Sequence, residues 1–349
     1  MNILYGVCGE GFGHSSRALV IGKYLEKKGH KVILLVYGQS YEVLKDKFKV
    51  IEIYGMHMVF NDSILKKRET IYHNLKIFPK NILKTKIFHR LIKEFKPDLC
   101  ICDMEPVVSI LANFYRIPLI TIDNQHLLTN FYIKIPEKFR KDFNLAKIVI
   151  NTFSKGSKYF IVTAFGIEIP NKKNTFLVYP IIKEEVKKLK AKYDKKILVY
   201  LNKQSKENDE KIIEILRKIK QKFVVFGFNI NKKDENLEFK TKEFFLEELE
   251  NCKAIIATSG FSLMSEAIYL KKPSFALPLK GQVEQVLNSL FLKEYGFGEY
   301  SENLNEKEVL RFLDNLEYYK KNLRKYKPDY DSLFKVLDRV LNEFEKINS

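Results

Sequence analysis

The sequence Ala257-Thr258-Ser259-Gly260-Phe261-Ser262-Leu263-Met264-Ser265-Glu266-Ala267 joins an apolar strand to a helix through a tight turn. Residues 253–258 predict the strand, Ser259-Gly260 the turn, and residues 261–270 the helix. A helix that starts here directs its unpaired backbone N–H groups toward the turn, where they attract phosphate. The stretch is therefore a candidate phosphate site in a parallel α/β sheet.

Glu266 lies four residues after Ser262 and so on the same face of this predicted helix. A carboxylate in that place can accept hydrogen bonds from the two hydroxyls of a ribose. The alternative is an acid that only complements the positive end of the helix dipole. The spacing is not the three residues of a capping box, which weakens the alternative without removing it.

A second polar cluster, Gln282, Glu284 and Gln285, follows the next predicted strand, residues 273–278. It lies beyond the carboxyl end of that strand, where open α/β sheets bind ligands. An acid beside an amide can hydrogen-bond the hydroxyls of a sugar. The alternative is a solvated loop that leads into a helix at 285–295.

Strand and helix patterns alternate along the chain and predict an α/β protein with two Rossmann-like domains facing a cleft. We expect an N-terminal domain at 1–170, a linker at 171–196, a C-terminal domain at 197–325 and a packing helix within 326–349, starting at Ser332. The predicted strands are 3–7, 32–37, 50–53, 99–102, 119–122, 148–151 and 160–163 in the first domain, and 197–201, 223–226, 254–258 and 274–277 in the second.

The bulk properties restrict the partners and the compartment. The formal net charge of the 349 residues is +18, which favours anionic binding partners such as lipid, acidic glycan or nucleic acid. A lysine-rich composition is also common in heat-adapted proteins, so the charge is a weak pointer. With no basic leader, no apolar run near ~20 residues and four cysteines in or beside apolar strands, we expect a cytoplasmic protein.

The loop Gly9-Glu10-Gly11-Phe12-Gly13-His14 follows the first predicted strand, and its glycines permit close approach of a ligand to the backbone. We expect Gly11, Phe12 and Gly13 to form an acceptor or phosphate loop. His14 stands where a dinucleotide fingerprint has its third glycine, and the Gly-Lys-Ser/Thr of a P-loop is missing. A nicotinamide enzyme and a P-loop kinase are therefore disfavoured.

His14 is a candidate general base, because it ends this loop at the carboxyl edge of the predicted sheet. Asp103 ends the strand 99–102 at the same edge and could orient an imidazole there. Glu105 and His126 converge on that edge too, and either could bind acceptor or serve as base instead. A capping or polar core histidine is the alternative for His14.

Residues 64–95 form a basic amphipathic segment with apolar side chains at helical spacing among lysines and arginines. We favour a surface helix that buries its apolar face in the first domain. Contact with a membrane surface is the alternative.

No metal or other cofactor is expected. The one Asp-x-Asp pair, Asp329 and Asp331, precedes the last predicted helix and suits an N-cap better than a metal site. Backbone N–H groups would then have to stabilise a leaving diphosphate.

Together these residues resemble a known family. The two-domain plan, the glycine loop that ends at His14, Ser259-Gly260 with Glu266, and Glu284-Gln285 look like the metal-independent, inverting GT-B glycosyltransferases. The nearest likeness is to the MurG-type N-acetylglucosaminyltransferases of the lipid-linked peptidoglycan precursor. The loop 9–17 resembles a branch described as teichoic-acid-like.

The resemblance implies a set of donor-binding residues and a catalytic pair. Glu266 would hold the ribose, the 259–262 turn would meet the diphosphate, and Phe245 would lie where relatives contact the base through the main chain. His14 would be the base, with Asp103 in support. The implied donor-binding residues are Phe245, Ser259, Gly260, Phe261, Ser262, Glu266, Gln282, Glu284 and Gln285.

One departure affects the phosphate site. Relatives carry a glycine-rich loop after the first strand of the second domain, where this chain has Asn202-Lys203-Gln204-Ser205. Either Lys203 substitutes by charge or the diphosphate is held differently. The identity of the nucleotide therefore stays open.

The resemblance implies an inverting, metal-independent transfer from a nucleoside-diphosphate sugar, most simply a UDP-sugar, to a hydroxyl of a glycan, lipid-linked or cell-surface polymer acceptor. An anionic surface at the inner face of the membrane is an expected partner, and nucleic acid is not. One alternative is a non-hydrolysing sugar-nucleotide 2-epimerase, against which the missing Gly-Thr-Arg-Pro-Glu argues. The other is an inactive basic scaffold on the same fold.

Overall fold

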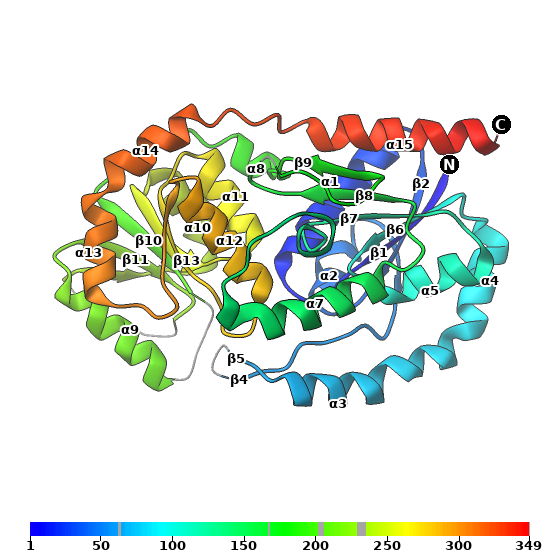
Figure 1. The fold of residues 1–349 in the computed structure, drawn as a ribbon, viewed down its shortest axis with the longest axis horizontal. Coiled ribbons are helices and arrows are strands. Elements are labelled where there is room, and N and C mark those ends of the chain that lie inside the picture. The colour runs from blue at the N-terminus through cyan, green and yellow to red at the C-terminus, as the bar shows by residue number, and fades with distance from the viewer. Residues whose placement is uncertain (62–63, 167, 202–205, 229–234, 349) are drawn as a thin grey trace. The chain divides into compact units, whose positions relative to one another are not determined.

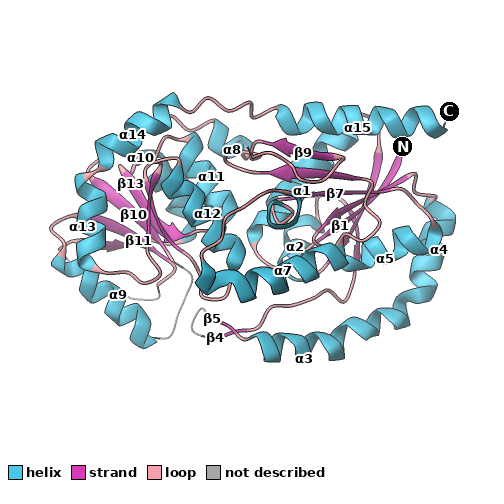
Figure 2. Cartoon of the chain, viewed as in Figure 1, coloured by secondary structure: helices cyan, strands magenta, loops and turns pink. Residues whose placement is uncertain are grey.

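The computed structural model describes residues 1–61, 64–166, 168–201, 206–228 and 235–348 (Figures 1 and 2). The chain divides into two compact units. Unit 1 consists of Met1–Val59, Lys66–Ile181 and Asp329–Ser349, and unit 2 of Phe60–Leu65 and Ile182–Pro328. Within the described residues, every helix is too short or too polar to span a bilayer.

Unit 1 is built on a seven-stranded parallel sheet in the order β3-β2-β1-β6-β7-β8-β9. Its inner strands are buried on both faces, which explains their near-continuous apolar sequences. The strands are β1 (Asn2–Val7), β2 (Lys31–Val36), β3 (Lys49–Glu52), β6 (Leu99–Asp103), β7 (Leu119–Asp123), β8 (Tyr159–Thr163) and β9 (Thr175–Val178).

Helices cover both faces of this sheet. Ile3 and Tyr5 of β1 pack against Ile21 of one helix and Leu337 of the last helix, while Leu4 faces a second cluster on the opposite side. The helices of unit 1 are α1 (Phe12–Lys27), α2 (Gly38–Leu44), α3 (Lys67–Ile77), the 3₁₀ helix η1 (Phe78–Lys84), α4 (Thr85–Phe95), α5 (Pro106–Tyr115), α6 (Leu127–Asn130), η2 (Glu137–Phe139), α7 (Arg140–Phe153) and α15 (Ser332–Asn348).

Unit 2 has a six-stranded parallel sheet in the order β12-β11-β10-β13-β14-β15. Its strands are β10 (Lys196–Tyr200), β11 (Lys222–Phe226), β12 (Leu237–Phe239), β13 (Ala254–Thr258), β14 (Ser274–Leu277) and β15 (Gly298–Tyr300). Its helices are α8 (Glu184–Lys187), α9 (Lys206–Lys218), η3 (Lys242–Phe244), α10 (Phe245–Asn251), α11 (Phe261–Tyr269), α12 (Val283–Glu294), α13 (Glu306–Asp314) and α14 (Leu316–Lys325). A short hairpin, β4 (Phe60–Asn61) with β5 (Ile64–Leu65), also belongs to unit 2, where the Leu65 N–H donates to the Lys280 carbonyl.

Each sheet has one point where the strand order reverses. In unit 1 that point lies between β1 and β6, and in unit 2 it lies between β10 and β13. Loops at the carboxyl ends of such strand pairs diverge to opposite faces of the sheet, which leaves a crevice for ligands. The predicted glycine loop, residues 9–13, follows β1 at the first point. The Ser259-Gly260 turn follows β13 at the second.

The predicted fold class, α/β with two Rossmann-like domains, is confirmed. One predicted strand is wrong, because residues 148–151 lie in α7. Their β-branched side chains favour a strand, but Ile148 is exposed while Ile150 is buried in the helical arrangement. The strand β9 lies inside the 171–196 segment predicted as a linker, and α15 packs along β8 and β9 in unit 1 (Figure 1).

Candidate functional site

The backbone of the glycine loop in unit 1, residues 9–13, passes close to Tyr37. A Cβ on Gly9 would lie 2.3 Å from the Tyr37 carbonyl oxygen, so only glycine fits there. Gly11 has φ +81° and ψ 150°, a conformation open to glycine alone, and it ends the loop where α1 begins. No side chain in the described part of the chain caps α1, and Phe12 in its first turn is 50% exposed.

His14 lies in the first turn of α1 and contacts Asp103, the last residue of β6. The Nδ1 atom of His14 is 2.6 Å from Oδ1 of Asp103. β1 and β6 are neighbours with Val7 in register with Asp103, so the point of strand-order reversal itself brings the pair together. The structure shows no described residue hydrogen-bonded to the other ring nitrogen, Nε2, and the His14 side chain is 13% exposed.

Arg17 completes this cluster, one turn further along α1. Its Nε donates to Asp103 Oδ2 at 2.8 Å and its Nη2 to Oδ1 at 2.6 Å. Burial would raise the pKa of Asp103, but the Arg17 guanidinium and His14 hold it below the usual value. Asp103 is therefore a fully buried carboxylate that stays ionised.

Glu105 lies near this cluster in sequence but has a different position. It is fully buried at the N-cap of α5, where its two oxygens accept the N–H groups of Val107 and Val108 at 2.7 Å each. Burial raises the pKa of Glu105 to about 8, although these N–H bonds oppose the rise. In this arrangement the carboxyl group fixes the start of α5.

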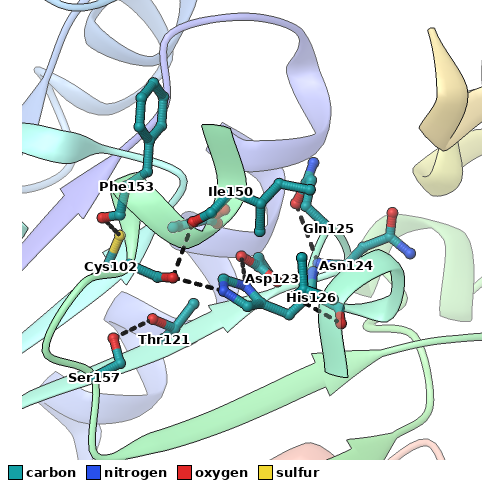
Figure 3. A network of polar contacts seen from close by, with 12 residues as sticks. Cys102, Thr121, Asp123, Asn124, Gln125, His126, Ile150, Phe153 and Ser157 are labelled. Atoms are coloured by element: carbon teal, nitrogen blue, oxygen red, sulfur yellow. Dashed lines mark hydrogen bonds and ion pairs between the residues drawn. The ribbon is translucent and has the colours of Figure 1, made fainter. Parts of the chain in front are cut away.

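His126 is also fully buried, and Figure 3 shows its ring hydrogen-bonded to Asp123. Its Nδ1 lies 2.7 Å from Asp123 Oδ2, and its Nε2 lies 2.7 Å from the Ser154 hydroxyl. Because both ring nitrogens are occupied within the protein, the imidazole ties the loop after β7 to the end of α7. This geometry gives His126 no direct path to an acceptor.

In unit 2, Ser259 and Gly260 join β13 to α11 as predicted. Ser259 is buried, its hydroxyl donates to the Gln285 carbonyl at 2.9 Å, and its own carbonyl accepts from the Asn288 amide at 3.0 Å. Gly260 is the N-cap of α11, and a Cβ there would meet no described atom within 4 Å. Ser259 therefore anchors the turn, while the Cβ position of Gly260, just before Phe261 and Ser262, faces open space.

Glu266 lies on α11, 5% exposed, with Oε1 3.0 Å from Nζ of Lys183. Burial raises the pKa of Glu266, and the charge of Lys183 opposes that rise. Lys183 stands just before α8 and is one-third exposed, and its ammonium group compensates the burial of the Glu266 carboxylate.

The cluster after β14 is organised around an amide. Gln285 accepts the Leu279 N–H at 3.0 Å and donates to Oε1 of Gln282 at 2.7 Å. Gln282 is the N-cap residue of α12, and Glu284 stands in its first turn. Gln285 thus braces the loop that carries the other two side chains.

Phe245 is the first residue of α10 and packs edge-on against two aromatic rings. The rings of Tyr200 and Phe226 have centroids 5.2 Å from its own. These two residues end β10 and β11, so the three rings gather at the carboxyl edge of the sheet. The start of α10 lies beside them.

Sequence reasoning gave no role to three residues of these sites: Arg17, Lys183 and Tyr200. Arg17 follows His14 by three residues on one helix, a spacing that places them on the same face. Tyr200 is the last residue but one of the predicted strand 197–201, which was a usable signal. The contact of Lys183 with Glu266 spans 83 residues and had no local signal.

Two further features of the sequence concern a possible metal site and the segment that follows β10. Among the described residues, no group of three or more histidine, cysteine, aspartate and glutamate side chains is arranged to hold a metal ion. The segment Asn202-Lys203-Gln204-Ser205, where relatives have a glycine-rich loop, lies outside the described residues.

Comparisons with known proteins agree with this architecture. An uncharacterized glycosyltransferase of Methanosarcina mazei is 26% identical, with 99% of this chain and 95% of that protein covered. The UDP-N-acetylglucosamine–N-acetylmuramyl-(pentapeptide) pyrophosphoryl-undecaprenol N-acetylglucosamine transferase of Clostridium tetani is 32% identical over 39% of this chain and 41% of its own length.

Among solved structures, Phytolacca americana UGT2 in complex with UDP-2-fluoro-glucose and pterostilbene has a TM-score of 0.72 at 13% identity, with 99% of both chains covered. This likeness shows the fold, which is GT-B. The model of glycosyl transferase family 1 matches residues 1–317. The chain therefore belongs to glycosyl transferase family 1 and is a glycosyltransferase.

Proposed function

We propose that this glycosyltransferase moves a sugar from a nucleoside-diphosphate donor, a UDP-sugar in the first instance, to a hydroxyl group of an acceptor. The observation that carries the proposal is the His14–Asp103 contact of 2.6 Å at the reversal point between β1 and β6, with Nε2 of His14 directed to no described partner. An imidazole oriented through Nδ1 is suited to take a proton at Nε2.

The proposed reaction is a single displacement. Nε2 of His14 takes the proton of the acceptor hydroxyl, whose oxygen attacks the anomeric carbon of the donor. The bond from that carbon to the diphosphate oxygen breaks, and the nucleoside diphosphate leaves with the electron pair. Attack opposite to the leaving group inverts the anomeric configuration.

We propose that unit 2 holds the donor. Backbone N–H groups and the dipole at the start of α11 would stabilise the leaving diphosphate without a metal ion. The ribose hydroxyls would bind Glu266 in place of Lys183, and the base would lie against α10 and the rings of Phe245 and Tyr200. Gln282 and Glu284 would contact the sugar. UDP is favoured because the Clostridium tetani relative and the UGT2 complex are named for UDP-sugars.

Calorimetric titration with nucleoside diphosphates, with and without Mg²⁺ or EDTA, tests the donor site. We expect UDP to bind without metal and Glu266→Gln to weaken it at least tenfold, because a neutral amide makes weaker hydrogen bonds to ribose hydroxyls. Glu214→Gln, an exposed change on α9, is the matched control. The absence of binding to every diphosphate would contradict the proposal.

His14→Asn tests the base. We expect unchanged UDP affinity and a loss of turnover of about 100- to 10,000-fold, the usual contribution of proton transfer. Release of UDP from a UDP-sugar with a hydroxyl acceptor measures it. Equal turnover in wild type and variant would assign the base elsewhere.

We further propose that the acceptor is lipid-linked or part of a cell-envelope polymer, and that unit 1 meets it at the cytoplasmic face of an anionic membrane. Residues 64–95 hold nine lysines and arginines against two acids. Apolar side chains of α3, η1 and α4 stand among these charges, each 50–79% exposed: Ile71, Tyr72, Leu75, Ile82, Leu83 and Ile87. Apolar insertion and lysine charge together suit reversible binding to anionic lipid.

Co-sedimentation with phosphatidylglycerol vesicles at low salt tests the membrane surface. We expect binding that weakens at least tenfold in the double variant Ile82→Ser, Leu83→Ser. Leu310→Ser on α13, where the side chain is 40% exposed, is the control. No binding by the wild-type protein would remove the membrane and leave a soluble glycan as acceptor.

A further inference from the structure

The proposed reaction assigns no role to Arg17, which lies in the cluster with His14 and Asp103. It is 8% exposed and holds both oxygens of Asp103, at 2.8 and 2.6 Å. A bidentate arginine–carboxylate pair is among the strongest and best-oriented polar contacts in proteins. The buried carboxylate therefore has its orientation and its charge fixed from α1.

The same guanidinium also lies against the imidazole. Oδ1 of Asp103 is 2.6 Å from Nδ1 of His14, and Nη2 of Arg17 is 3.1 Å from that ring nitrogen. A carboxylate at this distance favours the protonated imidazolium, whereas a permanent cation disfavours it. In a histidine–aspartate pair without an arginine, only the first effect would act.

The other titratable groups around the cluster do not replace either charge. Burial raises the pKa of Tyr5 on β1, and it raises the pKa of the Cys8 thiol to about 12, so both are neutral. Asp123 at the end of β7 is bonded to His126. Glu10 in the glycine loop lies 2.7 Å from Nδ1 of His57. Among the residues that the structure describes, Asp103 and Arg17 are the charged groups in contact with His14.

We infer that Arg17 is a positioning residue that opposes the effect of Asp103 on His14 and so leaves the imidazole able to accept a proton. It does so by neutralising Asp103 while leaving an oxygen of Asp103 to orient Nδ1–H. This inference rests on the proposed role of His14 as base. When Nε2 takes the acceptor proton, the net charge of the three side chains goes from zero to +1, and the imidazolium later returns the proton to water.

The titration of His14 by nuclear magnetic resonance tests the inference without any substrate. The chain has six histidines, and the signal missing from His14→Asn identifies the residue. In Arg17→Gln we expect the titration midpoint to rise by about one pH unit or more, because Asp103 is then uncompensated. Arg17→Lys keeps the charge and should leave the midpoint near that of wild type. Lys23→Gln, an exposed site on the same helix, controls for the loss of one positive charge.

The reciprocal variant, Asp103→Asn, keeps Arg17 and removes the carboxylate. Its midpoint should lie about one unit or more below that of the double variant Arg17→Gln, Asp103→Asn, which lacks both charges. This comparison isolates the effect of Arg17 if Arg17→Gln alone does not fold by circular dichroism. A midpoint equal to that of wild type in a folded Arg17→Gln, or equal midpoints in Asp103→Asn and the double variant, would overturn it.

Turnover and binding separate this inference from the proposed function. In an active preparation, the acid limb of the pH–turnover profile should move upward in Arg17→Gln while UDP affinity stays unchanged, because the donor residues lie in unit 2. A chain that bound no nucleotide would contradict the proposed function and still report the effect of Arg17 on His14.

Discussion

At the scale of single residues, two buried carboxyl groups on one sheet edge keep different protonation states. Asp103 is compensated by a guanidinium, so it stays ionised in a site that excludes water. Glu105 meets only the N–H groups of Val107 and Val108. Partial charges compensate burial less than a full charge does, which accounts for the raised pKa of Glu105.

This difference predicts a pH dependence of stability. The pKa of Glu105 is raised from 4.5 to about 8, so the folded protein holds this proton over a range where the unfolded chain releases it. The stabilisation is complete below pH 4.5 and is lost as pH rises through about 8. Relative to Glu105→Gln, wild type should lose up to roughly 1.4 kcal/mol of unfolding free energy per pH unit in that window.

Urea denaturation followed by circular dichroism from pH 5 to pH 9 would measure the difference between wild type and Glu105→Gln. Glu214→Gln on the exposed face of α9 should show a constant difference over the same range. A constant difference for Glu105→Gln as well would mean that the two N–H bonds outweigh burial.

The candidate residues differ in how much of their environment the sequence could predict. The closeness of His14 and Asp103 was predictable, because His14 follows one strand and Asp103 ends another at the carboxyl edge of the same parallel sheet. The hydrogen bond between His126 and Ser154 could not be predicted, since Ser154 ends a helix 28 residues away. Contacts of that kind depend on how a helix packs, which no local pattern encodes.

At the scale of elements, both candidate sites use the same unit: a buried strand, a turn with glycine, and a helix without a described side-chain cap. It occurs after β1 with Gly11 and after β13 with Gly260. Leaving a helix start uncapped costs stability, and it keeps backbone N–H groups available for an anion. The two sites differ in the side chain that the helix carries, a candidate base on α1 and a carboxylate on α11.

The backbone of Gly11 predicts a specific loss of function. Gly11→Ala adds a Cβ that meets no described atom within 4 Å, so the cost is the conformation with φ +81° alone, about 1–3 kcal/mol. We expect the loop to relax and move His14, lowering turnover at least tenfold while UDP affinity in unit 2 stays the same.

Gly29→Ala is the matched control for this loop. Gly29 has φ +87° and open space around its Cβ position, but it lies beyond the other end of α1. It should cost similar stability and leave turnover near wild type. If both variants lost turnover alike, general destabilisation would explain the effect of Gly11→Ala.

The regular elements were predictable where the pattern was local. Buried strands such as β1 and β13 follow from short apolar runs between turn signals. The helix that contains residues 148–151 could not be predicted. An isoleucine-valine-isoleucine run favours a strand unless its position on a helix face is known. The strand β9 has only four residues and follows the polar residues 171–174, and it is positioned by its pairing with β8.

At the scale of the whole molecule, the chain leaves unit 1 at Ile181 and returns to it at Asp329. The returning segment is α15, whose Leu333, Leu337 and Val340 are buried with Ile3 and Tyr5 of β1. The last helix of the sequence thus completes the core around the first strand.

This arrangement predicts that a substitution in the buried face of α15 lowers the stability of unit 1. Leu337→Ala removes a fully buried side chain and should destabilise unit 1 by about 2–5 kcal/mol. Hydrogen exchange by mass spectrometry should show faster exchange in peptides from β1 and β6, with β10 and β13 unchanged.

Phe312→Ala, in the core of unit 2, should give the reverse pattern. Lys335→Ala, at an exposed site on α15, should change neither. Equal loss of protection in both units of Leu337→Ala would show instead that α15 stabilises the two units together, so that the base and the donor site unfold as one.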